Sequence, residues 1–319
     1  MSYSPEQSHP WPVYTCPDPT SVYDGLGRPG PPPGIRQGSV DAPDMLDALV
    51  RGGRLDAPLA DGPLHEYCLC LRYVRPLQRD LMLHALPLCL KAWQESLFGM
   101  GHTDVAKAFH SALGNAPNII STTISDDAAR VVADFMRGSL IARMSRERTL
   151  RKPAGDLSVH TWIAFFASYG CIWPEVEKIF DDWRRLPLVG LSVAAIQYLS
   201  LLAYDDVEHP LFPAWSSSTG GGAPKPWDYA TEDGDSPTWL PENIKALAES
   251  LSVDGVQQWV CAAAQQLAGH TEHQLADLVA EDVGLQPYRV ESRIVDLVHH
   301  MASREAYKYW SDSYGMSGR

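Results

Sequence analysis

Apolar residues recur at helical spacing along most of the chain beyond residue 43. Between residues 125 and 144, for example, Val132, Met136, Leu140 and Met144 follow one another at intervals of four, and Phe135 lies three residues after Val132. Such spacing puts apolar side chains on one face of an α-helix. Comparable patterns follow, separated by Pro, Gly, Ser and Asp at positions typical of helix ends. We therefore predict a mainly α fold, an irregular bundle of about ten to twelve helices with little or no sheet.

One segment alternates instead. In residues 65–74, Tyr67, Leu69, Leu71 and Tyr73 occupy every second position. Alternation indicates a strand with one buried face, although a helix fits this segment equally well. It is the only plausible strand in the chain.

The first 43 residues contain ten prolines. Proline lacks a backbone donor and restricts the residue before it, so we expect neither a regular helix nor a central strand here. Trp11, Tyr14 and Tyr23 are larger apolar groups than a solvated tail needs. We predict an extended arm that is ordered by lying on a neighbouring surface, often a second subunit. Deletion of the arm should then leave a folded core that self-associates less.

A second break interrupts the helical pattern at residues 205–239, which are rich in Pro, Gly, Ser and Asp. Structureless stretches of this length are uncommon inside compact domains and indicate a linker or a functional loop. The predicted organisation is an arm at 1–43, a helical domain at 44–204, a long loop at 205–239 and a C-terminal helical subdomain at 240–319.

The overall charge limits the classes of partner. Among 319 residues, 26 Lys and Arg stand against 39 Asp and Glu, for a formal charge of −13. This sign argues against a protein wrapped wholly around polyphosphate. No apolar run is long enough for a membrane span, and the N-terminus has no basic region typical of a secretory signal. We expect a protein of the cytoplasm or of an assembled particle, without membrane contact.

The six cysteines are predicted to be reduced thiols, because a chain of this length can build its own core without disulfides. Cys68 and Cys70 are two positions apart and lack the spacing of a zinc or redox motif. The set is Cys16, Cys68, Cys70, Cys89, Cys171 and Cys261.

Residues 137–152 carry six cations and one anion, Glu147, within this acidic chain. The guanidinium fork suits phosphate and carboxylate groups, so an exposed site for nucleic acid or another anion is one interpretation. The other is a solvated helix end whose cations complement the helix dipole. The candidate residues are Arg137, Arg143, Arg146, Arg148, Arg151 and Lys152. We expect four of them, Arg143, Arg146, Arg148 and Arg151, to form an exposed patch and not buried ion pairs.

Charge is also polarised along the chain. Residues 201–290 hold fourteen Asp and Glu against Lys225, Lys245 and Arg289. A basic middle and an acidic C-terminal region on one molecule allow head-to-tail contacts between copies.

The best metal candidate is a group of three side chains at spacings of three and four, His270, His273 and Asp277. The signal is weak, because the helical zinc-protease motif requires two His four apart with a Glu beside the first. A polar outward face of a helix explains these residues equally well. No phosphate-binding loop and no nucleophile elbow occurs, so no catalytic residue and no cofactor is predicted.

Three functions remain open. The first is a non-enzymatic, self-assembling structural subunit of a coat, shell or filament, a requirement that viral coat proteins share, with single-stranded nucleic acid contacted through the basic segment. The second is an acidic helical inhibitor or immunity protein that covers a basic protein partner. The third is an enzyme with a cavity or metal site among its helices.

Overall fold

The computed structural model describes residues 11–36, 43–74, 77–116, 119–152, 156–204, 209–212, 224–227, 229–230 and 238–303. Every regular element within these residues is a helix, and no strand occurs among them. The predicted mainly α fold is confirmed. The helices run from α1 to α14, more than the ten to twelve predicted, partly because α1 and α6 are too short to show a period.

The helices have the following bounds: α1 Pro19–Gly25, α2 Pro43–Gly52, α3 Asp61–Tyr73, α4 Arg79–Leu97, α5 Thr103–Asn115, α6 Ile119–Thr123, α7 Asp126–Met144, α8 Ser158–Tyr169, α9 Val176–Arg185, α10 Val189–Ser200, α11 Pro241–Ser250, α12 Val253–Gln266, α13 His273–Leu285 and α14 Pro287–Ala302.

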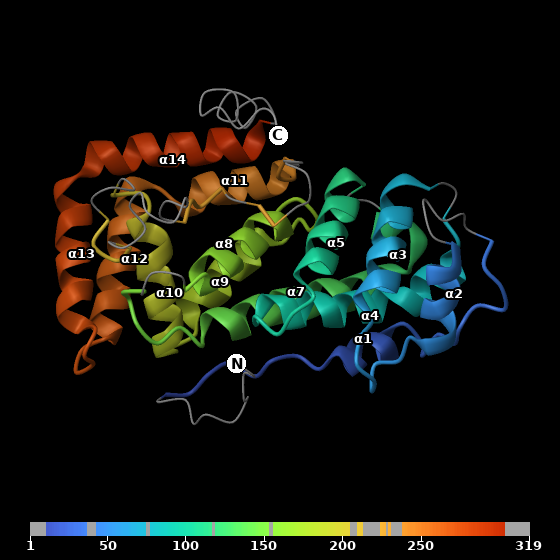
Figure 1. Ribbon diagram of the computed structural model, residues 1–319. Coiled ribbons are helices and arrows are strands. Elements are labelled where there is room, and N and C mark those ends of the chain that lie inside the picture. Colours follow the sequence, from blue (N-terminus) through green and yellow to red (C-terminus); the bar gives the residue numbers. More distant parts are fainter. Residues whose placement is uncertain are drawn as a thin grey trace, which may run out of the picture.

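Helix α7 connects the two ends of the molecule. It contacts α1 and α4 from the N-terminal part of the chain, and α8, α9 and α10 from the following part. Figure 1 shows α2, α3 and α5 toward one end and α12 and α13 toward the other, with α14 outermost above α11. In the described part of the chain, no helix is long and apolar enough to cross a membrane.

The alternating segment at 65–74 belongs to α3, so the strand interpretation is wrong. Leu64, Tyr67, Cys68 and Leu71 are buried, and their spacing of three and four is that of a helix face. Cys70 and Glu66 are buried as well. A helix that is buried on most sides has no polar face. Its helical period is then hard to recognise in the sequence.

Aromatic side chains fill the core between α8, α9, α10 and α12. Trp162 and Phe166 each meet Trp183 edge to face, with ring centroids 5.7 and 6.3 Å apart. Trp183 in turn meets Trp259 at 5.2 Å. Edge-to-face pairs add to the stabilisation that burial provides. The core therefore runs without interruption from α8 to α12, which belongs to the C-terminal part of the chain.

Segments of the long loop at 205–239 also enter this core. Trp239 is buried, and its indole Nε1 donates to the Ala167 carbonyl at 2.7 Å. Leu211 and Phe212 are buried as well. Burial lowers the pKa of His209 to about 3, so this side chain is neutral at pH 7.

The predicted division of the chain into domains stays a prediction.

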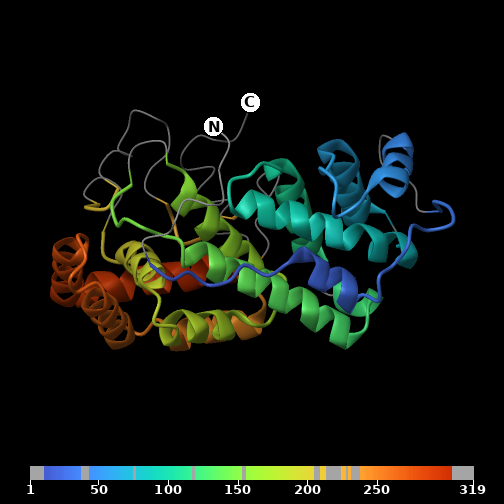
Figure 2. The same cartoon turned by 90° about the horizontal axis from the view of Figure 1, so that it is seen from below.

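The described part of the N-terminal arm, residues 11–36, lies on its own chain. The Tyr14 amide donates to Ser145 Oγ at 2.9 Å, and Gln94 Nε2 donates to the Pro17 carbonyl at 2.9 Å. Figure 2 shows the arm crossing the surface beside α7 before it reaches α1. Close approach requires a glycine, because a Cβ on Gly138 would lie 2.8 Å from the Pro17 ring.

Within the arm, residues Pro19–Gly25 form helix α1, which the count of prolines had argued against. Pro19 occupies the start of this helix, where proline loses no helical hydrogen bond. The Asp18 carboxylate caps the helix by accepting from the Thr20 amide at 2.9 Å. Val22 then packs into the core without any exposed surface.

We predict that Gly190→Ala destabilises the fold strongly. A Cβ at this position would lie 1.9 Å from the Ser145 carbonyl oxygen, and backbone atoms cannot rotate away as a side chain can. Overpacking of this kind costs about 1–3 kcal/mol or more of unfolding free energy. Gly34→Ala is the control, because a Cβ added there would meet no atom within 4 Å. Urea denaturation that gives equal midpoints for both variants would contradict the close packing of α7 and α10.

We also predict that Val22→Ala lowers the unfolding free energy by about 1–3 kcal/mol, because it opens a cavity under α1. The loss should not depend on protein concentration, since Val22 packs on its own chain. Thermal unfolding over a hundredfold dilution series measures this. A loss that shrinks as concentration rises would instead show that the arm packs on a second subunit.

Candidate functional site

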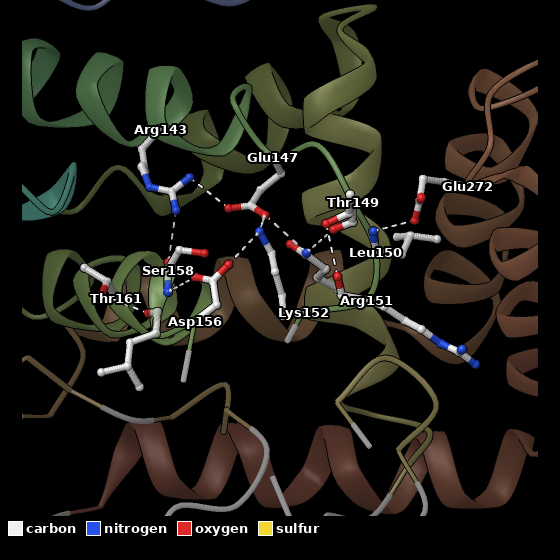
Figure 3. Close-up of polar contacts among 12 residues, drawn as sticks. Arg143, Glu147, Thr149, Leu150, Arg151, Lys152, Asp156, Ser158, Thr161 and Glu272 are labelled. Atoms are coloured by element: carbon white, nitrogen blue, oxygen red, sulfur yellow. Dashed lines mark hydrogen bonds and ion pairs between the residues drawn. The ribbon is translucent and has the colours of Figure 1, made fainter. Parts of the chain in front are cut away.

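The basic segment at 137–152 surrounds a buried carboxylate. Glu147 is 1% exposed and follows the end of α7. The Arg143 Nη1 atom lies 2.8 Å from Glu147 Oε1, and the Lys152 Nζ atom lies 2.7 Å from Oε2. Figure 3 shows the carboxylate between these two cations. Arg143 and Glu147 are four residues apart, the spacing at which a helix brings two side chains together.

Neighbouring groups complete the network. Gln197 Nε2, from α10, donates to Glu147 Oε2 at 3.2 Å and to the Thr149 carbonyl at 3.0 Å. Arg143 Nη2 donates to the Ser158 carbonyl at 3.2 Å. Residues 147–149 are therefore bonded to α7 and α10, and Arg143 also links α7 to α8.

The two cations decide the charge state of Glu147. Burial alone would raise the pKa of this carboxyl, but Arg143 and Lys152 outweigh burial and hold the pKa below its usual range. Glu147 is thus ionised at neutral pH. A carboxylate that is bonded on both oxygens and closed to solvent is a structural group and not an open proton acceptor.

The same segment reaches the C-terminal part of the molecule. The Leu150 amide donates to Glu272 Oε2 at 2.7 Å, beside the start of α13. Arg151 Nε donates to the Pro210 carbonyl at 3.1 Å. Glu272 is the N-cap residue of α13, but its carboxylate accepts from this other segment and caps no amide of its own helix.

The remaining cations of the segment are distributed over different surroundings. Arg137 pairs with Asp134 at 2.9 Å and lies 3.6 Å from Asp182. The Arg146 guanidinium lies over the Phe98 ring, 4.6 Å from its centroid. Arg148 is half-buried and Arg151 is exposed. No single surface collects all six cations.

The prediction of an exposed basic patch is therefore wrong for Arg143, which forms a buried ion pair with Glu147. Lys152 of the same segment is paired with Glu147 as well. It rested on the cost of burying unpaired guanidinium groups. Glu147 supplies the missing counter-charge from within the same segment. The i, i+4 spacing of Arg143 and Glu147 was the sequence signal that could have revealed the pair. Binding of nucleic acid by the segment stays a prediction.

The arm residues singled out from the sequence also face their own chain. Trp11 meets the His270 ring edge to face at 5.6 Å. Tyr14 packs against the core, and Tyr23 is half-buried in α1. The expectation that a second subunit orders the arm is not needed to explain its position.

The metal candidate is not assembled. His273 Nε2 lies 3.4 Å from Asp277 Oδ2, while His270 is turned to Trp11. In the part of the chain that the structure describes, no three His, Cys, Asp or Glu side chains gather as a metal site requires.

A second polar cluster joins α3, α4 and α5. His102 has a φ of 61°, a value rare for a residue with a side chain. Its Nδ1 contacts Asp61 Oδ1, and its Nε2 lies 3.0 Å from Glu95 Oε2. Since both ring nitrogens are engaged, this histidine closes the turn between α4 and α5 and leaves no nitrogen for a metal ion.

A cavity of about 420 Å³ lies between the arm, the loop at 53–56 and α4. Its walls are largely apolar, with Pro29, Pro31 and Leu88 among them. The charged residues at this cavity, Arg54 and Asp56, bond to each other through two contacts of 2.9 and 2.6 Å. The volume of this cavity suits a small molecule. Arg54 and Asp56 are paired with each other, however, so neither offers an unpaired charge to a ligand.

An exposed apolar face lies on α13 and α14. Leu278 is 49% exposed, Leu285 72%, Tyr288 85% and Val295 62%. Leu278 and Leu285 are seven residues apart, as are Tyr288 and Val295, so each pair lies on one side of its helix. We call these four residues the C-terminal apolar face. Sequence reasoning missed it, because apolar residues of an amphipathic helix are ordinarily assigned to the core.

Comparison with known proteins adds no assignment: no family model, no curated protein and no solved structure matches this chain.

We predict that Glu147→Gln lowers the unfolding free energy by about 3–5 kcal/mol, because Arg143 and Lys152 then lose their buried counter-charge. The control is Glu249→Gln, which removes the same charge from an exposed i, i+4 pair with Lys245 at 3.8 Å. That change should stay within about 0.5 kcal/mol. Urea denaturation at pH 7 compares the two.

The same variant should change the acid dependence of stability. The folded-state pKa of Glu147 is lowered, so its contribution is present above the pKa of the unfolded chain and is lost as pH falls through the folded-state pKa. Glu147→Gln should flatten this part of the stability profile. An unchanged profile would contradict the role given to the carboxylate.

Proposed function

We propose that this protein is a non-enzymatic structural subunit that assembles with copies of itself through the C-terminal apolar face. The observation that carries the proposal is the exposure of Leu285 and Tyr288 at the corner between α13 and α14. Large apolar side chains that are exposed together on two neighbouring helices can mark an interaction site. Burying such side chains in a contact would stabilise it by about 1.5–3 kcal/mol for each complete burial.

The position of this face supports the proposal. Figure 1 shows α14 on the outside of the molecule and α13 at its edge, so a partner can approach both helices. The opposite side of α14 packs on the body through Val290, Leu297 and Met301, which are buried. Covering Tyr288 and Val295 on the outer side would remove further apolar area from water.

Assembly through this face differs from assembly through the arm or the basic segment. The arm is bonded to its own chain at Tyr14 and Pro17. Arg143 and Lys152 are both ion-paired with Glu147, and Lys152 also lies 3.8 Å from Asp156. Nucleic acid contact therefore has weaker support than contact between copies. A coat, shell or filament would require a second, different contact in addition to this one.

We predict that the wild-type protein gains mass with concentration in size-exclusion chromatography with light scattering. A double variant, Leu285→Ser with Tyr288→Ser, should raise the dissociation constant at least about tenfold, since it removes two large apolar contacts. Association should change little between low and high salt, because it depends on apolar burial.

The matched control is Leu157→Ser, which removes an exposed apolar side chain outside this face (58% exposed). It should assemble as the wild type does. A wild-type protein that stays monomeric at every concentration and at both salt concentrations would refute the proposal.

A further inference from the structure

The cavity of about 420 Å³ lies where α4 meets the arm and the end of α2. Helix α4 contacts both α1 and α2, and Figure 1 shows the three helices at one end of the molecule. One face of α4 forms the floor of the cavity through His84, Pro87 and Leu88. Pro87 and Leu88 are buried, whereas Thr20 and Asp56, which also line the cavity, are exposed. The cavity therefore has a buried floor and a mouth that opens to solvent.

Both walls of the cavity are bonded to α4. On the side of the arm, Gln78 Nε2 donates to the Gly34 carbonyl at 2.7 Å, and Gln78 Oε1 accepts from the Arg36 amide at 2.6 Å. On the side of the loop, Lys91 Nζ donates to the Leu55 carbonyl at 2.7 Å. A cavity whose walls are fixed in advance loses little conformational freedom when a ligand binds.

Pro87 is an unusual residue for this floor, because it lies inside α4. In a helix, the carbonyl of residue 83 points at the nitrogen of residue 87. Proline has no N–H group, so Pro87 cannot donate to the Leu83 carbonyl, and a proline at such a position normally destabilises a helix. Here the missing bond leaves a backbone acceptor beside a residue that lines the cavity.

The His84 imidazole adds a second acceptor to the floor. Burial lowers the pKa of His84, so the ring is uncharged at pH 7 and has a single N–H group. A hydrogen bond to the Leu49 backbone uses that group, and the ring nitrogen without a proton can only accept. Among the described residues, His84 Nε2 has no hydrogen-bond partner.

The charges at the cavity favour an uncharged ligand. Arg54 and Asp56 bond to each other, and the His84 ring is neutral. A charged ligand would lose its water here without gaining an unpaired counter-charge. The arm side of the cavity carries the rings of Tyr23 and Pro29, whose apolar surfaces suit another ring.

We propose that this cavity binds a small, uncharged ring compound that donates a hydrogen bond through a hydroxyl or N–H group. The donor bonds to the His84 imidazole, with the Leu83 carbonyl as a second acceptor on the same floor, and the ring lies against the arm. This site is independent of self-assembly through the C-terminal apolar face. It gives the proline-rich arm a role within its own chain, which is to form one wall of the site.

Three naphthalene derivatives of similar size test the chemistry of the ligand. 2-Naphthol is uncharged and has a hydroxyl donor, 2-methoxynaphthalene lacks the donor, and 2-naphthoate is charged at pH 7. In equilibrium dialysis with the full-length protein, 2-naphthol should bind saturably, with a dissociation constant about tenfold lower than that of 2-methoxynaphthalene, because the ether leaves the acceptors unpaired. 2-Naphthoate should bind most weakly. Equal binding of the two uncharged probes, or tightest binding of 2-naphthoate, would overturn the inference.

Substitution of His84 tests the acceptor. His84→Leu should bring the affinities for 2-naphthol and 2-methoxynaphthalene to within about threefold of each other, through a loss of 2-naphthol binding alone. The control is His299→Leu, because His299 is exposed on α14 and does not line the cavity. It should bind both probes as the wild type does. A His84→Leu variant that keeps the full preference for 2-naphthol would contradict the assignment.

A substitution at the mouth tests the location without changing the buried floor. Thr20→Trp places a large side chain at the mouth and should weaken the binding of both uncharged probes about tenfold or more. Because Thr20 is exposed, the fold does not depend on its side chain. The control is Ser21→Trp, at an exposed neighbour in α1 that does not line the cavity.

The remaining outcomes are decisive in the same way. If Thr20→Trp binds 2-naphthol as tightly as the wild type, the probe lies elsewhere and the inference is wrong. It is also wrong if the wild type binds none of the three probes saturably, as would follow if another part of the same chain fills the cavity. None of these results depends on the oligomeric state, so this inference and the proposed self-assembly can fail separately.

Discussion

The buried ion pairs of Glu147 hold the middle of the molecule together. The carboxylate lies between Arg143 on α7 and Lys152 on the following loop, with both oxygens bonded. Removing such groups from water is costly, and only close pairing with further hydrogen bonds compensates for it. Gln197 supplies one of these bonds from α10. The position of the loop between α7 and α8 depends on this arrangement.

The consequences reach both ends of the chain. The same loop bonds to Glu272 beside α13 and to the segment at 209–212, while the end of α7 binds the arm through Ser145. Basic residues that the sequence suggests as a ligand-binding site are thus bonded to distant segments of the same chain. The surface that we propose for a partner is the outer side of the C-terminal helices, where Leu278, Leu285, Tyr288 and Val295 are exposed.

Local signals predicted most of the helical fold. Ser125 and Ser252 accept from the amides of Ala128 and Gly255, as expected of helix caps. Pro241 and Pro287 begin α11 and α14. These features depend on a few consecutive residues, so the sequence alone contains them.

Features that depend on distant residues were not predictable in this way. Glu272, the N-cap residue of α13, makes no side-chain cap of its own helix and instead accepts from the Leu150 amide, 122 residues away. The arm was read as an assembly device, because its binding surface on α7 is visible only after folding. For the candidate site, the basic residues were found but the role of Glu147 was not. A list of charges does not show which of them meet inside the fold.

Hydrogen–deuterium exchange of the wild-type protein at two concentrations, one below and one above its association range, tests the central claim most directly. The account predicts that protection of α14, and of the end of α13, rises with concentration. Amides of the arm and of the segment at 143–152 should be equally protected in both samples, because their partners belong to the same chain. Concentration-dependent protection of the arm or the basic segment, with none in α14, would contradict the account.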